Sequence, residues 1–334
     1  MKLHALVIAL AGTVFALGAA AQQPLVIKFS HVVANDTPKG KASDFFARKA
    51  AELTKGKVKV AVYPNSTLYK DKEEMEALQL GAVHLLAPSL AKFGPLGVRE
   101  FEVFDLPFIF DNAEELHRVT AGPVGQALFA KLETKGITGL AYWDNGFKSL
   151  SANKPLKAPE DFKGLKMRIQ SSKVLESQMR SVGAIPQVMA FSEVYQALQT
   201  GVVDGTENPH SNLYTQKMHE VQKHLTLSEH GYLGYAVITN KKFWDGLPAD
   251  VRGALEQAMK ESTAYANKIA KEENDAALEA VKKSGKTAVY TPTPAERLAL
   301  KKAMVRTHKE MESRIGKETI ETVYKATGFD PSKL

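Results

Sequence analysis

The chain has 334 residues, of which 44% are hydrophobic and 24% are charged, and its formal net charge is +7 at pH 7. This composition is typical of a globular protein, and the length suffices for two domains of ordinary size. Cysteine is absent, which excludes disulfides, thiol chemistry and cysteine-ligated metal sites.

The basic residues are scattered among acidic ones rather than collected in runs. The segments DKEEMEAL (71–78) and KEENDAALEAVKKSGK (271–286) show this mixture, which is typical of solvated faces. We therefore expect no nucleic-acid partner, although the basic balance suits a small anionic ligand.

The first residues differ from the rest of the chain. Lys2 precedes an apolar run from Ala5 to Leu17, and the small residues 19–21 come before Gln22. This pattern predicts a secretory signal peptide over residues 1–21 and export of the mature protein to the periplasm. A retained membrane anchor is the alternative, but the run is shorter than the ~20 residues of a spanning helix.

Short strand-like runs alternate with helical segments along the mature chain. A helix is predicted over 38–53 and another over 71–81. Strands are predicted at 25–33, 57–65, 82–89, 137–144, 165–171, 202–207, 232–240 and 287–291. This alternation predicts an α/β fold around a mostly parallel sheet, arranged as two interleaved lobes.

One predicted helix is longer than the others and runs from Pro248 to about Ser284, where Gly285 supplies a stop. Apolar residues recur in it at helical spacing, at Val251, Leu255, Ala258, Ala266, Ile269, Ala277 and Val281. A helix of ~35 residues extends about 50 Å, which would brace both lobes. The alternative is two helices with a break near Glu273.

The strand-like stretch GLKMRIQSSK (164–173) carries an arginine at its centre. Because side chains alternate along a strand, Met167 and Ile169 share one face and Arg168 and Gln170 share the other. From this pattern alone, Arg168 could face water, a partner chain or a ligand.

Catalytic motifs are missing from the sequence. It contains no GxSxG, GxGxxG, GxxxxGK[ST] or HExxH, so hydrolase, dinucleotide, P-loop and zincin functions lack their usual anchors. The histidines, including His117, His219 and His224, have no spacing that would place metal ligands on one helix face. The sequence therefore predicts no enzyme, no cofactor and no metal site.

The segment MAFSEVYQALQTGVVDGTENP (189–209) resembles the solute-binding subunits of TRAP transporters, the DctP family that includes dicarboxylate-binding members. Three further segments share the resemblance: FSHVVANDTPKGKA near the mature start, EVFDLPFIF (102–110) and HGYLGYAVITNKKFW (230–244). It implies a type II-like periplasmic binding protein fold of two lobes, with a long helix spanning both. We expect lobe I at 22–145 plus 234–273, lobe II at 146–233 plus 274–334, and a ligand cleft between them.

The resemblance also implies roles for individual residues. Arg168 matches the arginine that clamps a ligand carboxylate, and Asn208 matches the asparagine that assists it. A planar guanidinium offers two parallel N–H donors to a carboxylate, which lysine cannot reproduce. Lys148 stands where sialic-acid-binding relatives carry arginine, and this departure argues against sialic acid as the ligand.

Weaker candidates surround these positions. Lys39, Lys92 and Lys148 could each meet a second carboxylate, or could be exposed lysines. Phe191 resembles the aromatic cleft wall of the family, although packing under a helix explains it equally well. Further hydrogen bonds to ligand could come from Asn145, Ser89, Asn212 and His31, while Trp143 and Tyr235 could line the cavity or fill the core.

The predicted function is therefore capture of a small organic acid by an exported, monomeric receptor that passes it to integral membrane permease subunits. A C4-dicarboxylate such as succinate, fumarate or malate is the preferred ligand. The alternatives are a keto acid, lactate-like acid, sugar acid or aromatic acid, a receptor of the ABC type, or a periplasmic enzyme acting on an anionic substrate.

Overall fold

The computed structural model describes residues 23–334, so the predicted signal peptide lies outside the described residues. The strands are β1 (Leu25–Ser30), β2 (Val58–Tyr63), β3 (Leu85–Leu86), β4 (Ile137–Phe147), β5 (Ser149–Ala152), β6 (Lys166–Ile169), β7 (Ile185–Val188), β8 (Gly205–Asn208), β9 (His224–Thr226), β10 (Tyr232–Asn240) and β11 (Ala288–Tyr290). The α-helices are α1 (Pro38–Leu53), α2 (Glu73–Gln79), α3 (Ala113–Ala121), α4 (Pro123–Glu133), α5 (Lys173–Ser181), α6 (Val194–Gln199), α7 (His210–Thr215), α8 (Lys241–Asp245), α9 (Ala249–Ser284), α10 (Pro294–Met304), α11 (Arg306–Glu310), α12 (Glu312–Ile315) and α13 (Lys317–Thr327).

The strands form two separate sheets. The first has the order β2-β1-β3-β10-β4, and the second has the order β11-β9-β5-β8-β6-β7. Alternation buries Ile27 and Phe29 of β1 in a core that also contains Phe46 of α1 and Leu255 of α9. Met167 and Ile169 of β6 lie in the core of the second sheet. Two sheets with helices around them confirm the α/β two-lobe fold.

The prediction of a mostly parallel sheet holds only in part, because both sheets are mixed. In the first sheet, β10 runs antiparallel to β3 and to β4. In the second sheet, β5 runs antiparallel to β8 and to β9. The reason is that β4 leads out of the first sheet into β5, whereas β9 leads back from the second sheet into β10, so these strands run in opposite directions.

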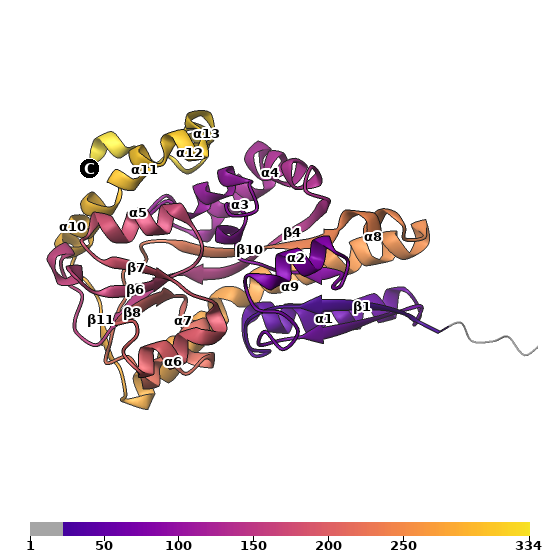
Figure 1. Cartoon of the computed structure of the whole chain (residues 1–334), viewed down its shortest axis with the longest axis horizontal. Helices are drawn as coiled ribbons and strands as arrows, with labels where there is room; N and C mark the ends of the chain where they lie inside the picture. Colours follow the sequence, from indigo (N-terminus) through magenta and orange to yellow (C-terminus); the bar gives the residue numbers. More distant parts are fainter. Residues whose placement is uncertain (1–22) are drawn as a thin grey trace, which may run out of the picture.

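The chain crosses between the sheets at neighbouring points. Lys148 is the single residue between β4 and β5, and residues 227–231 join β9 to β10. The two crossings touch, since the backbone N–H of Lys148 donates to the Gly231 carbonyl at 2.8 Å. In Figure 1, β4 and β10 run side by side through the middle of the molecule toward the strands of the second sheet.

The long helix α9 is a third connection. It is continuous over 36 residues, so the alternative of a break near Glu273 is wrong. It packs against α1 and β4 on the side of the first sheet and against α7 on the side of the second. It ends at Gly285, whose φ of 65° is the left-handed conformation that glycine adopts without strain.

The C-terminal helices return toward the first sheet. Ile315 of α12 and Ile320 and Val323 of α13 share one hydrophobic core with Ile137 of β4 and Ile238 of β10. The segment 274–334 therefore does not pack with the second sheet alone. The lobe boundaries drawn from the sequence stay a prediction.

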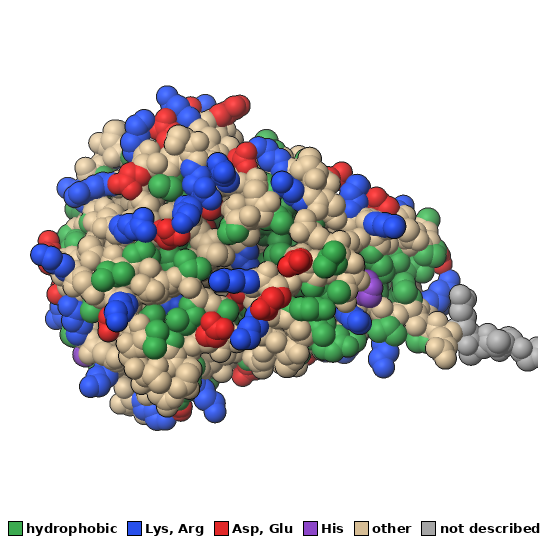
Figure 2. All heavy atoms as spheres, in the orientation of Figure 1, with side chains coloured by type: hydrophobic (Ala, Val, Ile, Leu, Met, Phe, Trp, Pro, Cys, Tyr) green, Lys and Arg blue, Asp and Glu red, His purple; other side chains and the backbone are tan. Residues whose placement is uncertain are grey.

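The surface carries charges of both signs. Figure 2 shows lysine and arginine side chains spread over the face in view, with aspartate and glutamate among them. None of the helices within residues 23–334 is long and apolar enough to cross a membrane. Nor does that part of the chain hold a group of three His, Asp or Glu side chains placed to bind a metal ion.

Candidate ligand-binding site

Arg168 lies on an interior strand of the second sheet, with its side chain buried at 3% exposure. Its Nε and Nη2 atoms donate to the Met189 carbonyl at 3.1 and 2.8 Å, and its Cζ lies 5.7 Å from the ring centre of Phe191. Within residues 23–334 it forms no salt bridge, and Nη1 makes no hydrogen bond. Burial lowers the pKa of Arg168, while Asp71 and Glu207 oppose that shift. A buried cation in this state favours the arrival of an anion.

Asn208 shares the face of the sheet on which Arg168 lies. Arg168 pairs with Thr206 across the parallel strands β6 and β8, and Asn208 stands two residues after Thr206. The Asn208 side-chain amide donates to Thr206 Oγ1 at 3.3 Å. Arg168 and Asn208, the two residues expected to hold a ligand carboxylate, therefore lie on adjacent strands of one face.

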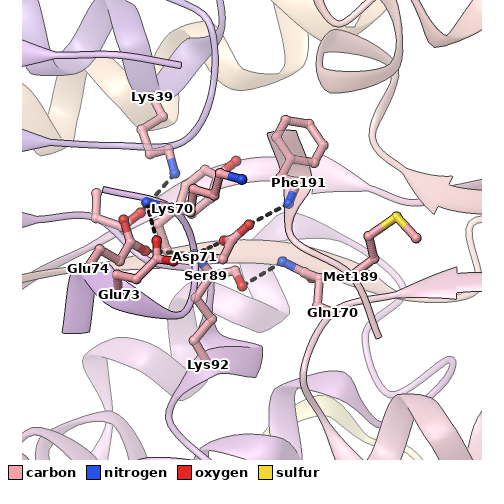
Figure 3. A network of polar contacts seen from close by, with 12 residues as sticks. Lys39, Lys70, Asp71, Glu73, Glu74, Ser89, Lys92, Gln170, Met189 and Phe191 are labelled. Atoms are coloured by element: carbon pink, nitrogen blue, oxygen red, sulfur yellow. Dashed lines mark hydrogen bonds and ion pairs between the residues drawn. The ribbon is translucent and has the colours of Figure 1, made fainter. Parts of the chain in front are cut away.

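A small pocket of about 20 Å³ lies in front of Arg168. Arg168, Gln170, Ser171, Val188, Met189 and Ala190 line one wall, while Asp71, Lys72 and Lys92 line the other. The walls are tied together where Gln170 Nε2 donates to Ser89 Oγ at 2.6 Å. Figure 3 shows this tie and the charged residues beside it.

The charge of Lys92 is neutralised by two acidic side chains. It forms ion pairs with Asp71 and with Glu74, the latter at 2.7 Å. Asp71 also accepts a hydrogen bond from the Phe191 backbone N–H at 2.5 Å, so it lies between Lys92 and Phe191 (Figure 3). Burial alone would raise the pKa of Asp71, but Lys92 and the Phe191 N–H together hold it at about 2.

The interpretation of DKEEMEAL as a solvated face is wrong for two of its acids. The side chains of Asp71 and Glu74 are only 14% and 1% exposed. The physical reason is the buried Lys92, which needs anionic partners in the interior and takes them from this segment.

Lys39 is a buried cation without an acidic partner. Its side chain comes from the first turn of α1, where Thr37 caps the helix, and Lys39 is 1% exposed. The Nζ atom donates to the Ala87 carbonyl at 2.9 Å and lies 3.8 Å from the ring centre of Tyr235. Within residues 23–334 it forms no salt bridge. Burial and the charge of Lys92 lower the pKa of Lys39 to about 7.

His31 lies close to Lys39 and is also buried. Both of its ring nitrogens lack a hydrogen-bond partner among the described residues. Burial and the charge of Lys39 lower its pKa to about 3, so the imidazole is neutral at physiological pH. His31 thus has unused hydrogen-bonding capacity beside an unpaired cation.

Lys148 is paired on the opposite side of the second sheet. Its Nζ atom lies 2.7 Å from Glu207 Oε1, and Glu207 Oε2 lies 2.7 Å from His230 Nε2. Burial alone would raise the pKa of Glu207, but Lys148 and His230 together hold it at about 2. Glu207 points away from the face of Thr206 and Asn208, because neighbouring residues of a strand alternate. Lys148 therefore joins a buried ionic network at the crossing point.

Asn145 and Asn212 belong to a buried network that also contains Tyr235. Asn145 Nδ2 donates to Asn212 Oδ1 at 3.0 Å and to the Tyr235 hydroxyl at 2.6 Å. Trp143, by contrast, packs in the core of the first sheet and donates to Thr263 Oγ1 at 2.9 Å. Tyr235 thus connects the amide network to Lys39, whereas Trp143 fills the core.

The structure separates the four lysine and arginine candidates into two kinds. Lys92 and Lys148 have carboxylate partners, whereas Lys39 and Arg168 have only backbone carbonyls as acceptors. Asp71 is close enough to shift the pKa of both Lys39 and Arg168, so these two cations lie in one electrostatic neighbourhood.

The sequence does not single out two acids that form interior ion pairs. Asp71 lies in a charge-rich segment, and Glu207 directly precedes Asn208. A signal for Glu207 existed: an acid inside an interior strand needs a buried cation, and Lys148 was available.

The chain matches known proteins over most of its length. Residues 29–314 match the family model DctP, described as bacterial extracellular solute-binding protein, family 7. The C4-dicarboxylate-binding periplasmic protein DctP of Rhodobacter capsulatus is 68% identical over 305 residues, which cover 91% of this chain and 92% of that protein.

Solved structures agree in fold. A TRAP periplasmic solute-binding protein from Sulfurospirillum deleyianum with bound succinate has a TM-score of 0.89 and 50% identity, covering 91% of this chain and 100% of that one. Another from Pseudomonas aeruginosa with bound L-malate has a TM-score of 0.84 and 44% identity, covering 86% and 100%.

These matches decide the class of protein. The family consists of solute-binding proteins rather than enzymes, so the enzyme alternative is wrong. The solved relatives are TRAP receptors, which sets aside the ABC-type alternative. The chain belongs to the DctP family of bacterial extracellular solute-binding proteins, the solute-binding proteins of TRAP transporters.

Proposed function

We propose that this protein is a periplasmic receptor that captures a C4-dicarboxylate such as succinate, fumarate or malate. The observation that carries the proposal is the presence of two buried cations, Arg168 and Lys39, that have no carboxylate partner among residues 23–334. A ligand with a carboxylate at each end would neutralise both.

Arg168 holds the first carboxylate in this proposal. Two of its nitrogens are fixed by the Met189 carbonyl, which orients the guanidinium and leaves Nη1 for the ligand. Asn208, on the same face, adds a hydrogen bond, and Phe191 bounds the site beside the guanidinium.

Lys39 holds the second carboxylate. Its ammonium group has three donors, of which one is used by Ala87. His31, Ser89 and the amides of Asn145 and Asn212 supply further hydrogen bonds. Lys92 and Lys148 act indirectly, because their charges are already neutralised. The relatives with bound succinate and L-malate support this choice of ligand.

Closure of the lobes over the ligand completes the mechanism. The two strand crossings and α9 connect the sheets, and the ligand shifts the population toward the closed form by its higher affinity for that form. The closed receptor, exported by its signal peptide and acting as a monomer, delivers the acid to integral membrane permease subunits.

A thermal-shift screen tests the ligand class. A ligand at 100 times its dissociation constant adds about 2.7 kcal/mol of stability. We expect succinate, fumarate and malate to raise the melting temperature, and butyrate, which has one carboxylate, to raise it much less. A flat response to the C4 acids with a shift for a sugar acid would contradict the ligand assignment.

Substitution of Arg168 tests the clamp. Loss of one partner from a buried charge pair costs about 3–5 kcal/mol, or roughly two to four decades of affinity. Arg168→Ala should therefore nearly abolish succinate binding in calorimetry, and Arg168→Lys should weaken it strongly. Lys166→Ala, at an exposed position on the same strand, is the matched control and should bind normally. Near-normal affinity in either Arg168 variant would exclude the clamp.

A further inference from the structure

Direct contacts between protein groups join the two walls of the pocket. The Asp71 carboxylate accepts from the Phe191 N–H at 2.5 Å, and Ser89 accepts from Gln170 at 2.6 Å. A third link, between Lys70 and Glu193, spans 3.1 Å at the surface. The first of these is the only one of the three in which a largely buried, ionised group is the acceptor.

The Phe191 N–H belongs to the same short segment that orients Arg168. The Met189 carbonyl accepts from Arg168, and two residues later the Phe191 N–H donates to Asp71. The ring of Phe191 lies beside the guanidinium. A carboxylate that fixes this segment therefore also fixes the acceptor that aims the arginine.

Asp71 has a second partner besides the Phe191 N–H. It is paired with Lys92, whose other partner is the buried Glu74. Phe191 opens the short helix Phe191–Glu193, which leads directly into α6, so the contact with Asp71 also fixes the start of this segment.

We propose that Asp71 is a positioning residue that latches the two lobes together and holds the Met189–Phe191 segment behind Arg168. Asp71 itself makes no attractive contact with the ligand. This inference rests on the proposed function, because it assigns Asp71 a role in closure around an anionic ligand.

The direction in which removal of Asp71 changes the affinity for a dicarboxylate distinguishes a latch from a residue that acts only through its charge. Asp71 is an anion that lines the small pocket in front of Arg168, the residue proposed to bind another anion. If it acted only through its charge, its removal would relieve repulsion and tighten binding of a dicarboxylate. If it acts as a latch, its removal weakens binding, because the closed form and the orientation of Arg168 lose support.

The experiment compares Asp71→Ala, the isosteric Asp71→Asn and the control Glu193→Gln by calorimetry with succinate. Glu193 belongs to the exposed link, where both side chains are 51% exposed, and exposed ion pairs contribute little. We expect Asp71→Ala to weaken succinate binding about 10- to 100-fold, Asp71→Asn to weaken it less, and Glu193→Gln to change it less than about twofold.

A distance measurement supplies an independent readout. The sequence has no cysteine, so spin labels at Lys59→Cys and Lys223→Cys, exposed positions on strands β2 and just before β9, report one distance between the sheets. We expect Asp71→Ala with saturating succinate to show a larger open population than the wild type.

The outcomes are distinguishable. Succinate affinity in Asp71→Ala or Asp71→Asn that equals or exceeds that of the wild type overturns the latch, as does an unchanged distance distribution in Asp71→Ala. A wild-type protein that binds no C4-dicarboxylate overturns the proposed function instead. In that case, distances measured without ligand still decide the latch, which requires a smaller closed population in Asp71→Ala.

Discussion

Three lysines of this protein have similar burial but different neighbouring groups, and this difference separates their roles. Lys39, Lys92 and Lys148 are all buried, yet only Lys39 lacks a carboxylate within the described chain. The energetic cost of burying a charge explains the difference, because Lys92 and Lys148 recover it from Asp71, Glu74 and Glu207. In the proposed function, Lys39 recovers it from a ligand carboxylate.

This assignment predicts that binding takes up a proton. The pKa of Lys39 is lowered to about 7 by burial and Lys92, and a bound carboxylate favours the charged form. The affinity for succinate should therefore fall as the pH rises from about 7 to about 9, a range in which carboxylic acids stay ionised. His31, Asp71 and Tyr235, with pKa values of about 3, 2 and 12, titrate outside this range.

Calorimetry in buffers of different ionisation enthalpy measures the uptake. The variant Lys39→Met should lose the pH dependence and bind succinate about 10- to 100-fold more weakly, with little change for butyrate. Lys41→Met, on the same helix but in a half-exposed pair with Glu273, is the control. A wild-type affinity that is constant between about pH 7 and pH 9 would rule out Lys39 as the second anchor.

For individual residues, the sequence predicted the face of a strand on which a side chain lies better than it predicted the groups that the side chain contacts. The alternation around Arg168 separated it correctly from Met167 and Ile169, because period two is a local property. The partners of Lys92 and Lys148 could not be predicted, since Glu74 and Glu207 reach them through tertiary packing that no local pattern encodes.

At the scale of elements, α9 and β10 were predicted most accurately. The helix α9 was predicted almost to its bounds, because its apolar positions repeat over 36 residues and Gly285 ends it. The strand β10 was predicted with its bounds as well. The short strands β5, β7 and β9 were missed, although β6, β8 and β11, which are equally short, lie within predicted strands.

The role of α9 as a brace gives a prediction about stability. Asn274 lies inside this helix, where its amide donates to the Asn145 carbonyl at 2.7 Å and accepts from the Ser211 N–H at 2.9 Å. It thereby joins β4 to α7 across the helix. Asn274→Ala leaves both backbone groups unpaired and should lower the free energy of unfolding by about 1–3 kcal/mol.

Denaturant unfolding measures this loss. Lys271→Ala, one turn earlier on the exposed side of α9, is the matched control and should change stability little. If Asn274→Ala is as stable as the control, the helix does not brace the two sheets through this residue.

At the scale of the whole molecule, the connections between the sheets determine what the site can do. Two strand crossings and one helix join the parts that carry Lys39 and Arg168, so a ligand that touches both residues favours one arrangement of the lobes. The two-lobe fold followed from the alternation of elements and from family resemblance. The order and direction of the strands did not, because they depend on where the chain crosses between sheets.

A crystal structure of the protein grown with succinate tests the central claim most directly. We predict one succinate carboxylate on the Arg168 guanidinium, including Nη1, and the other within about 3.2 Å of Lys39 Nζ. Succinate bound elsewhere, with Arg168 still donating to the Met189 carbonyl alone, would contradict the account.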